Sequence, residues 1–328
     1  MPPNLFAFAT SELSQDAALA YLLSWADPSH AATHPVLHSA GRDLLARLFA
    51  KHDHPTPDPA LSVTAQRQVH YIDVLVTVGD VAVVAIEDKT NTGHHSDQLA
   101  RYLEVLRAHF PGRTHVPIFL KTGEQCDYAD VHAKGWRVIE RRDLLACLRP
   151  HADKTDHAIL VDFVEHLEQI DRHVHAWTTA PLDQWTPRAW QGFFGALTNH
   201  VEGGWDYVPN QTGGFMGFWW GWRPVEGGQL YPQLEDGRLV IKLSVEEGHD
   251  RATLRDHWLP YILGDLAPLG FVRPARLGHG KTMTLAVVDE YRRTTDGRLD
   301  LPATVAVLRE AAARLHDCVA RHHTPGGT

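Results

Sequence analysis

The chain has 328 residues, 44% of them hydrophobic, which is enough for about two globular domains with sizeable cores. Its formal net charge of −9 argues against a generally basic surface that wraps nucleic acid non-specifically, although a local basic groove is compatible with it. There is no apolar run of membrane-spanning length, and residues 1–4 lack the basic start of a signal peptide.

The N-terminal half predicts helices and strands that together form a mixed sheet with helices on its faces. A helix over 13–25 is apolar around most of its circumference, and the proline-containing stretch 27–39 is expected to link it to the next helix. Further helices are expected at 42–51, 96–109, 142–148 and 157–170, and strands at 63–69, 70–77, 81–86, 116–121 and 136–140.

Two valine- and isoleucine-rich strands flank Gly79-Asp80, which is a hairpin signal. The first strand contains Asp73, and the second is followed by Glu87-Asp88-Lys89. Because side chains alternate along a strand, Glu87 and Lys89 share one face and Asp88 lies on the other. Two carboxylates beside a lysine can hold a divalent cation through oxygen ligands, an arrangement suited to phosphodiester hydrolysis.

This order of residues resembles the PD-(D/E)XK nuclease superfamily, in which an acid in one strand precedes an acid-x-lysine in the next. The sequence from Gln98 to Tyr102 is similar to the Gln-x-x-x-Tyr motif of RecB-like members, and Glu12 opens a helix where many relatives carry a glutamate. No proline precedes Asp73, which departs from a common pattern of the superfamily. The resemblance covers roughly the N-terminal half of the chain.

The resemblance implies a restriction-endonuclease-like core that binds Mg²⁺ or Mn²⁺ through Asp73, Glu87 and the backbone carbonyl of Asp88. It implies that Lys89 polarises the attacking water. Gln98 and Tyr102 would position water at the metal or the nucleic acid strand, and Glu12 would serve a second metal or orient a water. Nucleic acid is the implied partner, DNA rather than RNA, in a setting of bacterial defence against foreign DNA.

The hairpin register tests this hypothesis. A two-residue loop at Gly79-Asp80 sets Asp73 opposite Ile86 and sends Glu87 to the wrong face. A three-residue loop or a bulge shifts the pairing by one residue and places Asp73 opposite Glu87. The nuclease hypothesis requires the shifted register. The alternative is an edge hairpin whose acids simply face water.

A composition change near 175–181 separates an expected nuclease-like domain, residues 1–175, from an α+β domain of recognition or assembly type, residues 176–328. The second domain is rich in tryptophan and predicts a hairpin around Asp236-Gly237, helices near 253–266 and 302–316, and a strand at 283–288. The aromatic run 215–222 favours a sheet core, with stacking of unpaired bases as the alternative.

Other motifs carry less weight. The segment 275–282 fits a permissive phosphate-binding loop with Lys281, but a strand is expected after it where such a loop needs a helix, so we expect it to join two strands. The 23 histidines show no zinc-like spacing, although His94 and His95 follow Lys89 closely enough to approach substrate phosphates. Two rival functions remain: a nuclease-like fold that binds without cutting, and a nucleotide hydrolase that uses Lys281.

The three cysteines, Cys126, Cys147 and Cys318, form neither a metal motif nor an even disulfide framework, which favours a reducing cytoplasm. We therefore expect a cytoplasmic protein with no membrane partner. The sequence leaves open the oligomeric state, a homo-oligomer included, as well as the cleavage preference and the ligand of the second domain.

Overall fold

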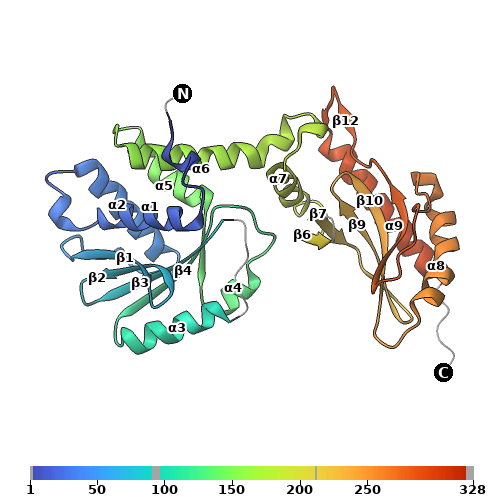
Figure 1. The fold of residues 1–328 in the computed structure, drawn as a ribbon, viewed down its shortest axis with the longest axis horizontal. Coiled ribbons are helices and arrows are strands. Elements are labelled where there is room, and N and C mark those ends of the chain that lie inside the picture. The colour runs from blue at the N-terminus through green and yellow to red at the C-terminus, as the bar shows by residue number, and fades with distance from the viewer. Residues whose placement is uncertain (1–2, 91–96, 211–212, 323–328) are drawn as a thin grey trace. The chain divides into compact units, whose positions relative to one another are not determined.

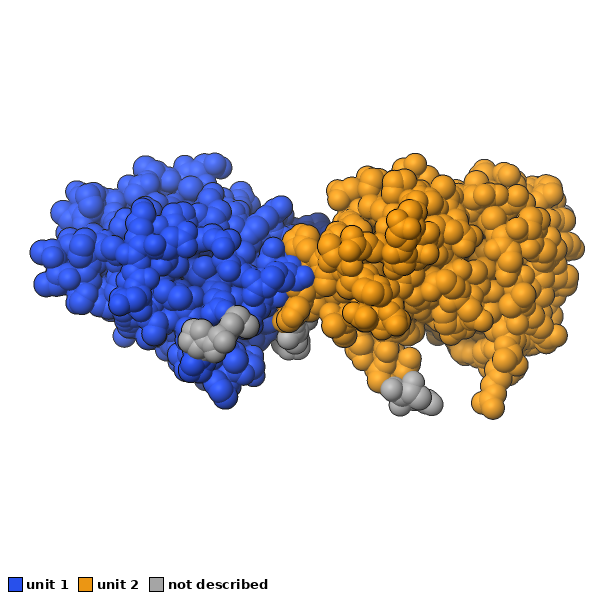
Figure 2. Space-filling model, turned by 90° about the horizontal axis from the view of Figure 1, so that it is seen from above, with its two compact units in different colours: residues 1–172 blue, residues 173–328 orange. Residues whose placement is uncertain are grey.

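The computed structural model describes residues 3–90, 97–210 and 213–322, and the chain divides into two compact units, residues 1–172 and 173–328 (Figures 1 and 2). Each unit has its own sheet. Among the helices of the described ranges, none has the length and apolar character needed to cross a membrane.

The first unit is an α/β structure built on a five-stranded mixed sheet in the order β1-β2-β3-β4-β5. The first three strands pair antiparallel, and β3, β4 and β5 run parallel. The strands are β1 (Val63–Val69), β2 (Ile72–Val78), β3 (Ala82–Lys89), β4 (Thr114–Lys121) and β5 (Arg137–Glu140). The helices are α1 (Glu12–Ser24), α2 (Pro35–Ala50), α3 (Gln98–His109), α4 (Ala129–Ala133), α5 (Arg141–Ala152) and α6 (Ala158–His175), the last of which crosses the boundary between the units.

Helices cover both faces of this sheet (Figure 1). Alternate residues of β2 and β3, such as Val76 and Val84, pack with α1, α2, α5 and α6 in one core. The residues between them, such as Leu75 and Ala85, pack with α3 and α4 in a second core. Because both faces are buried, β2 and β3 read as continuous apolar runs, and the charged residues at the end of β3 stand out against them.

The elements of this unit match the sequence expectations except at several ends and for the short helix α4, which was not predicted. The stretch 27–39 was expected to be a linker, but α2 begins at Pro35, whose fixed φ and missing N–H suit the first turn of a helix. Helix α5 extends to Ala152 and contains Pro150, and α6 extends to His175. The expected start of α3 at Ser96 lies outside the described residues.

The second unit combines an antiparallel sheet in the order β11-β10-β9-β7-β6, with β8 also paired to β9, and helices that pack against it. The predicted Asp236-Gly237 turn joins β9 to β10. The strands are β6 (Gly203–Asn210), β7 (Gly213–Trp220), β8 (Arg223–Val225), β9 (Gly228–Glu235), β10 (Arg238–Val245) and β11 (Thr282–Val288), with the short pair β12 (Thr294–Thr295) and β13 (Arg298–Leu299). The helices are α7 (Pro187–Leu197), α8 (Arg251–Leu266) and α9 (Leu301–His322).

The segment 275–281 is not a phosphate-binding loop. Strand β11 follows it directly, so no helix start presents backbone amides to a phosphate. We expected this segment to join two strands. A strand does follow it, but the residues directly before it form only an isolated bridge from Val272 to Val287, so this part of the expectation is wrong. The nucleotide-hydrolase reading of Lys281 therefore lacks its structural basis.

Candidate active site

The hairpin between β2 and β3 has the shifted register that the nuclease hypothesis requires. Val78 pairs with Ala82 and Val74 with Ile86, and this register, extended by one residue, places Asp73 opposite Glu87. The loop consists of three residues and begins at Gly79, whose φ of +47° favours glycine. Asp73 and Glu87 therefore project from the same face of the sheet, the face that packs on α3.

The ammonium of Lys89 lies among three oxygen groups at the end of β3. Its Nζ forms an ion pair with Oε1 of Glu87, lies 3.8 Å from Oδ2 of Asp73 and donates to the carbonyl of Asp88 at 3.1 Å. These are the three groups that the resemblance implies as metal ligands. In this structure they converge on a single positive charge.

The backbone helps to fix these side chains. Oδ2 of Asp73 accepts a hydrogen bond from the backbone N–H of Asp88 at 3.0 Å, and Oδ1 accepts from the Gln68 side chain at 3.2 Å. The Asp73 carboxylate thus bridges the start of β2 and the end of β3. A carboxylate held by two donors is positioned before any ligand arrives.

Burial shapes the electrostatics of the pair formed by Glu87 and Lys89. The Glu87 side chain is fully buried, and burial together with the charge of Asp73 raises its pKa to about 8, although Lys89 opposes the shift. Burial alone lowers the pKa of Lys89, but the hydrogen bond and charge of Glu87 outweigh it, so that its pKa is raised overall. Lys89 therefore remains an ammonium near neutral pH.

A second group of polar side chains lies on the opposite face of β3. Asp88 is buried there against α1, where it accepts a hydrogen bond from Gln15 at 2.5 Å and contacts the carboxyl group of Asp16. Burial and the charge of Asp16 raise the pKa of Asp88 well above its ordinary value. Burial and the charge of Asp73 raise the pKa of Asp16 to about 6, although the hydrogen bond with Asp88 opposes the shift. This raised pair favours one shared proton between the two carboxyl groups.

Sequence reasoning did not single out Gln15 and Asp16. A signal was present, since both lie within one helical turn of Glu12 and place polar groups on a face of α1 that is otherwise apolar. Asp88 was expected on the opposite face from Glu87, and a carboxyl buried there needs a hydrogen-bonding partner.

Glu12 lies at the start of α1 and reaches the end of β3. Its Oε1 accepts a hydrogen bond from the backbone N–H of Thr90 at 2.7 Å, and its negative charge contributes to the raised pKa of Lys89. The structure thus brings Glu12 to the same end of the sheet as Asp73, Glu87 and Lys89.

Gln98 and Tyr102 form a hydrogen-bonded chain with the backbone rather than with the carboxylates. Nε2 of Gln98 donates to the Tyr102 hydroxyl at 2.9 Å, and that hydroxyl donates to the Tyr71 carbonyl at 2.6 Å. Tyr71 stands two positions before Asp73, in a tight turn where His70 and Tyr71 both have positive φ. The geometry shows Tyr102 holding the entry to β2, which positions Asp73.

We expect Tyr102→Phe to lower the free energy of unfolding by about 1 kcal/mol, because the Tyr71 carbonyl and the Gln98 amide lose their partner in a partly buried setting. Chemical denaturation measures this change. The control is Tyr71→Phe, which removes an exposed hydroxyl and keeps the backbone carbonyl. Equal stability of the two variants would mean that the Tyr102 hydroxyl does not hold the turn.

The carboxylates of Asp73 and Glu87 and the backbone carbonyl of Asp88 are suitable ligands for a hard divalent cation. All three are oxygens, and Mg²⁺ is usually held through one or two carboxylates while it keeps several waters. Among the residues that the structure describes, Oε2 of Glu87 and Oε1 of Gln98 are buried without a hydrogen-bond partner. Within the same residues, no group of three or more histidine, cysteine, aspartate or glutamate side chains is arranged to hold a metal. The protein ligands of a metal at this site would therefore be two carboxylates and one backbone carbonyl.

The remaining residues singled out from the sequence cannot be placed. His94 and His95, which follow β3 closely, lie outside the described residues.

Comparisons of the chain with protein-family models, curated proteins and solved structures find no match.

Proposed function

We propose that the chain is a metal-dependent nuclease of the PD-(D/E)XK type that hydrolyses phosphodiester bonds of DNA. The observation that supports this most directly is the convergence of Asp73, Glu87 and the Asp88 carbonyl on one cationic group, Lys89 Nζ. A chance arrangement of surface acids would not bury Glu87. The five-stranded mixed sheet would then be a restriction-endonuclease-like core.

In this proposal Asp73, Glu87 and the Asp88 carbonyl hold Mg²⁺ or Mn²⁺. When bound, the metal would activate water and neutralise charge that develops on the phosphate. Lys89 supplies a fixed positive charge for the attacking oxygen and the phosphate, and its raised pKa keeps it protonated. Tyr102 orients Asp73 through the Tyr71 carbonyl.

DNA is proposed ahead of RNA because the resemblance points to enzymes that mostly cut DNA. The catalytically silent alternative, a nuclease-like fold that binds nucleic acid or protein, keeps the same geometry but predicts no turnover.

The test is incubation of the full chain with linear duplex, circular and single-stranded DNA in the presence of Mg²⁺, Mn²⁺ or EDTA. We expect cleavage with either metal and none in EDTA, and cutting of the circular substrate would identify an endonuclease. Absence of cleavage, together with absence of Mn²⁺ binding in calorimetry, would contradict the proposal and favour the silent fold.

A further inference from the structure

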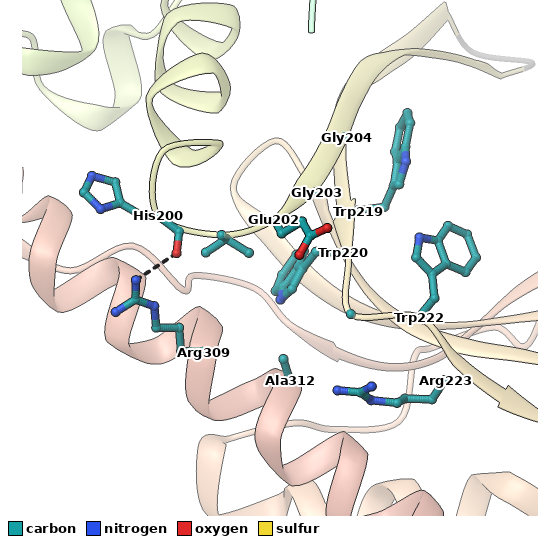
Figure 3. A pocket seen from close by; sticks show the side chains of 12 residues that line it. His200, Glu202, Gly203, Gly204, Trp219, Trp220, Trp222, Arg223, Arg309 and Ala312 are labelled. Atoms are coloured by element: carbon teal, nitrogen blue, oxygen red, sulfur yellow. Dashed lines mark hydrogen bonds between the residues drawn. The ribbon is translucent and has the colours of Figure 1, made fainter. Parts of the chain in front are cut away.

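The second unit contains an open cleft of about 720 Å³ (Figure 3). Its walls come from the segment before β6, from β7 and β8, and from α9. The side chains that matter for its chemistry are Glu202, Trp219, Trp220, Trp222, Arg223 and Arg309. Because every lining residue belongs to residues 173–328, the cleft is a feature of this unit alone.

The cleft forms where one edge of the sheet is interrupted. Strands β7 and β8 both pair with β9, but the pairing stops between Trp219 and Arg223. Gly221 has a φ of +59° in this gap, and the facing part of β9 contains Pro232, which has no N–H to donate. The break lets Trp222 leave the strand.

Trp222 supplies a flat aromatic surface at the cleft. Its ring stacks on Tyr231 with 3.7 Å between the ring centroids, and its side chain remains 42% exposed. Trp219 lines the same cleft, whereas Gly203 and Gly204 line it without side chains. A rigid exposed indole is a suitable platform for a planar ligand, because every nucleobase has a face that can stack on it.

The cleft wall also carries donors that lack an acceptor. Within the described ranges, Nε1 of Trp220 and Nε of Arg223 are buried without a hydrogen-bond partner, and the Trp220 side chain is only 3% exposed. An unsatisfied buried donor costs about 1–3 kcal/mol. Both nitrogens are shielded from solvent, so the groups that a ligand in the cleft meets first are the exposed ones.

The charged side chains of the cleft favour a ligand that combines an anionic group with a polar base. Arg309 on α9 and Arg223 on β8 lie on opposite sides of the cleft (Figure 3). One N–H of Arg309 is fixed by the His200 carbonyl at 2.8 Å, which orients its guanidinium and leaves other donors for a phosphate. Glu202 adds a carboxylate that can accept from the amino group of a base.

We propose that this cleft binds one nucleotide unit, with its base stacked on Trp222 and its phosphate between Arg309 and Arg223. The unit belongs either to an unpaired DNA or RNA strand or to a free nucleotide. Double-stranded DNA does not fit this description, since its bases are not available for stacking on a side chain. The inference goes beyond the proposed cleavage and does not require it.

The experiment measures binding by the full-length protein in EDTA, so that no metal-dependent cleavage can occur. The probes are a short fluorescein-labelled single strand of mixed sequence, its blunt duplex, and AMP and GMP as competitors. We expect the single strand to bind more tightly than the duplex. Competition by the mononucleotides at concentrations comparable to the strand would assign a free-nucleotide site, and lack of competition would assign a strand site.

Two variants on opposite walls locate the binding. Trp222→Ala should weaken binding about fivefold to a hundredfold. Arg309→Gln should weaken it severalfold and reduce its salt dependence, and this exposed residue of α9 can be changed without disturbing the core. The matched control is Tyr207→Ala, which removes an exposed ring of the same sheet outside the cleft.

The proposal is overturned if the wild-type protein binds neither the single strand nor the mononucleotides, or if both variants bind as the wild type does. A protein that binds but does not cut would retain this inference and lose only the proposed nuclease activity.

Discussion

Lys89→Ala is expected to lower the rate of DNA cleavage about 100- to 1,000-fold while the protein remains folded. The ammonium is the positive charge on which the three oxygen groups converge, and removal of one preorganised transition-state contact costs about this much. The variant leaves Glu87 buried without its cation, but a carboxyl whose pKa is already about 8 can become protonated and so avoid an unpaired charge.

Cleavage rates at saturating metal, together with circular dichroism and thermal unfolding, measure this effect. The matched control is Lys51→Ala, which removes a lysine of the same unit that pairs with Asp143 at 2.8 Å. We expect the control to cut at the wild-type rate. Equal activity of wild type and Lys89→Ala would point to a contaminating enzyme or to another active site.

Asp73→Asn is expected to weaken Mn²⁺ binding by more than about 100-fold. Loss of a residue that only hydrogen-bonds to a metal ligand weakens metal binding roughly 10- to 100-fold, and Asp73 is proposed as a ligand itself. The amide oxygen can still accept from the backbone N–H of Asp88, so the start of β2 should keep its place. What the substitution removes is one of the two negative charges for a hard cation. Cleavage should fall in parallel with metal occupancy.

Isothermal calorimetry with Mn²⁺ measures the affinity directly and does not depend on substrate. The control is Asp80→Asn at the other end of the same hairpin, where the carboxylate is 98% exposed and pairs with Arg113. Unchanged Mn²⁺ affinity in Asp73→Asn would exclude Asp73 as a ligand, and the proposed metal site would then lack its first carboxylate.

The candidate site shows what sequence patterns can predict. Local rules were enough for the hairpin, for the common face of Glu87 and Lys89, and for the opposite face of Asp88, because side chains alternate along any strand. The choice between two registers needed one more fact, the length of the loop at Gly79. Both loop lengths were compatible with the sequence, and the structure has three residues there.

Contacts between distant segments were less accessible. Tyr102 was singled out as a motif residue, but its partner is the Tyr71 backbone carbonyl, which no side-chain pattern reveals. Gln15 and Asp16 come close to Asp88 only because α1 packs across the hairpin, more than seventy positions away in the chain. Such pairs depend on how helices pack on the sheet.

The cleft of the second unit depends on tertiary structure in the same way. The tryptophan-rich run 215–222 predicted strands, but its alternation could not say which rings would be buried. That was decided by the interruption of the sheet at Gly221, by Pro232 on the neighbouring strand and by α9, which approaches from the far end of the chain.

The sequence by itself determined the class of the first unit, the positions of most of its elements and the acids and lysine at the end of β3, because these follow from periodicity and turn chemistry within a few residues. Only the tertiary structure decided which buried carboxyl groups lie together, which backbone atom Tyr102 holds, and where unsatisfied donors occur in the wall of a cleft. The physical reason is that burial and hydrogen-bond pairing are properties of the whole packed chain, and they set the charge state of each polar group.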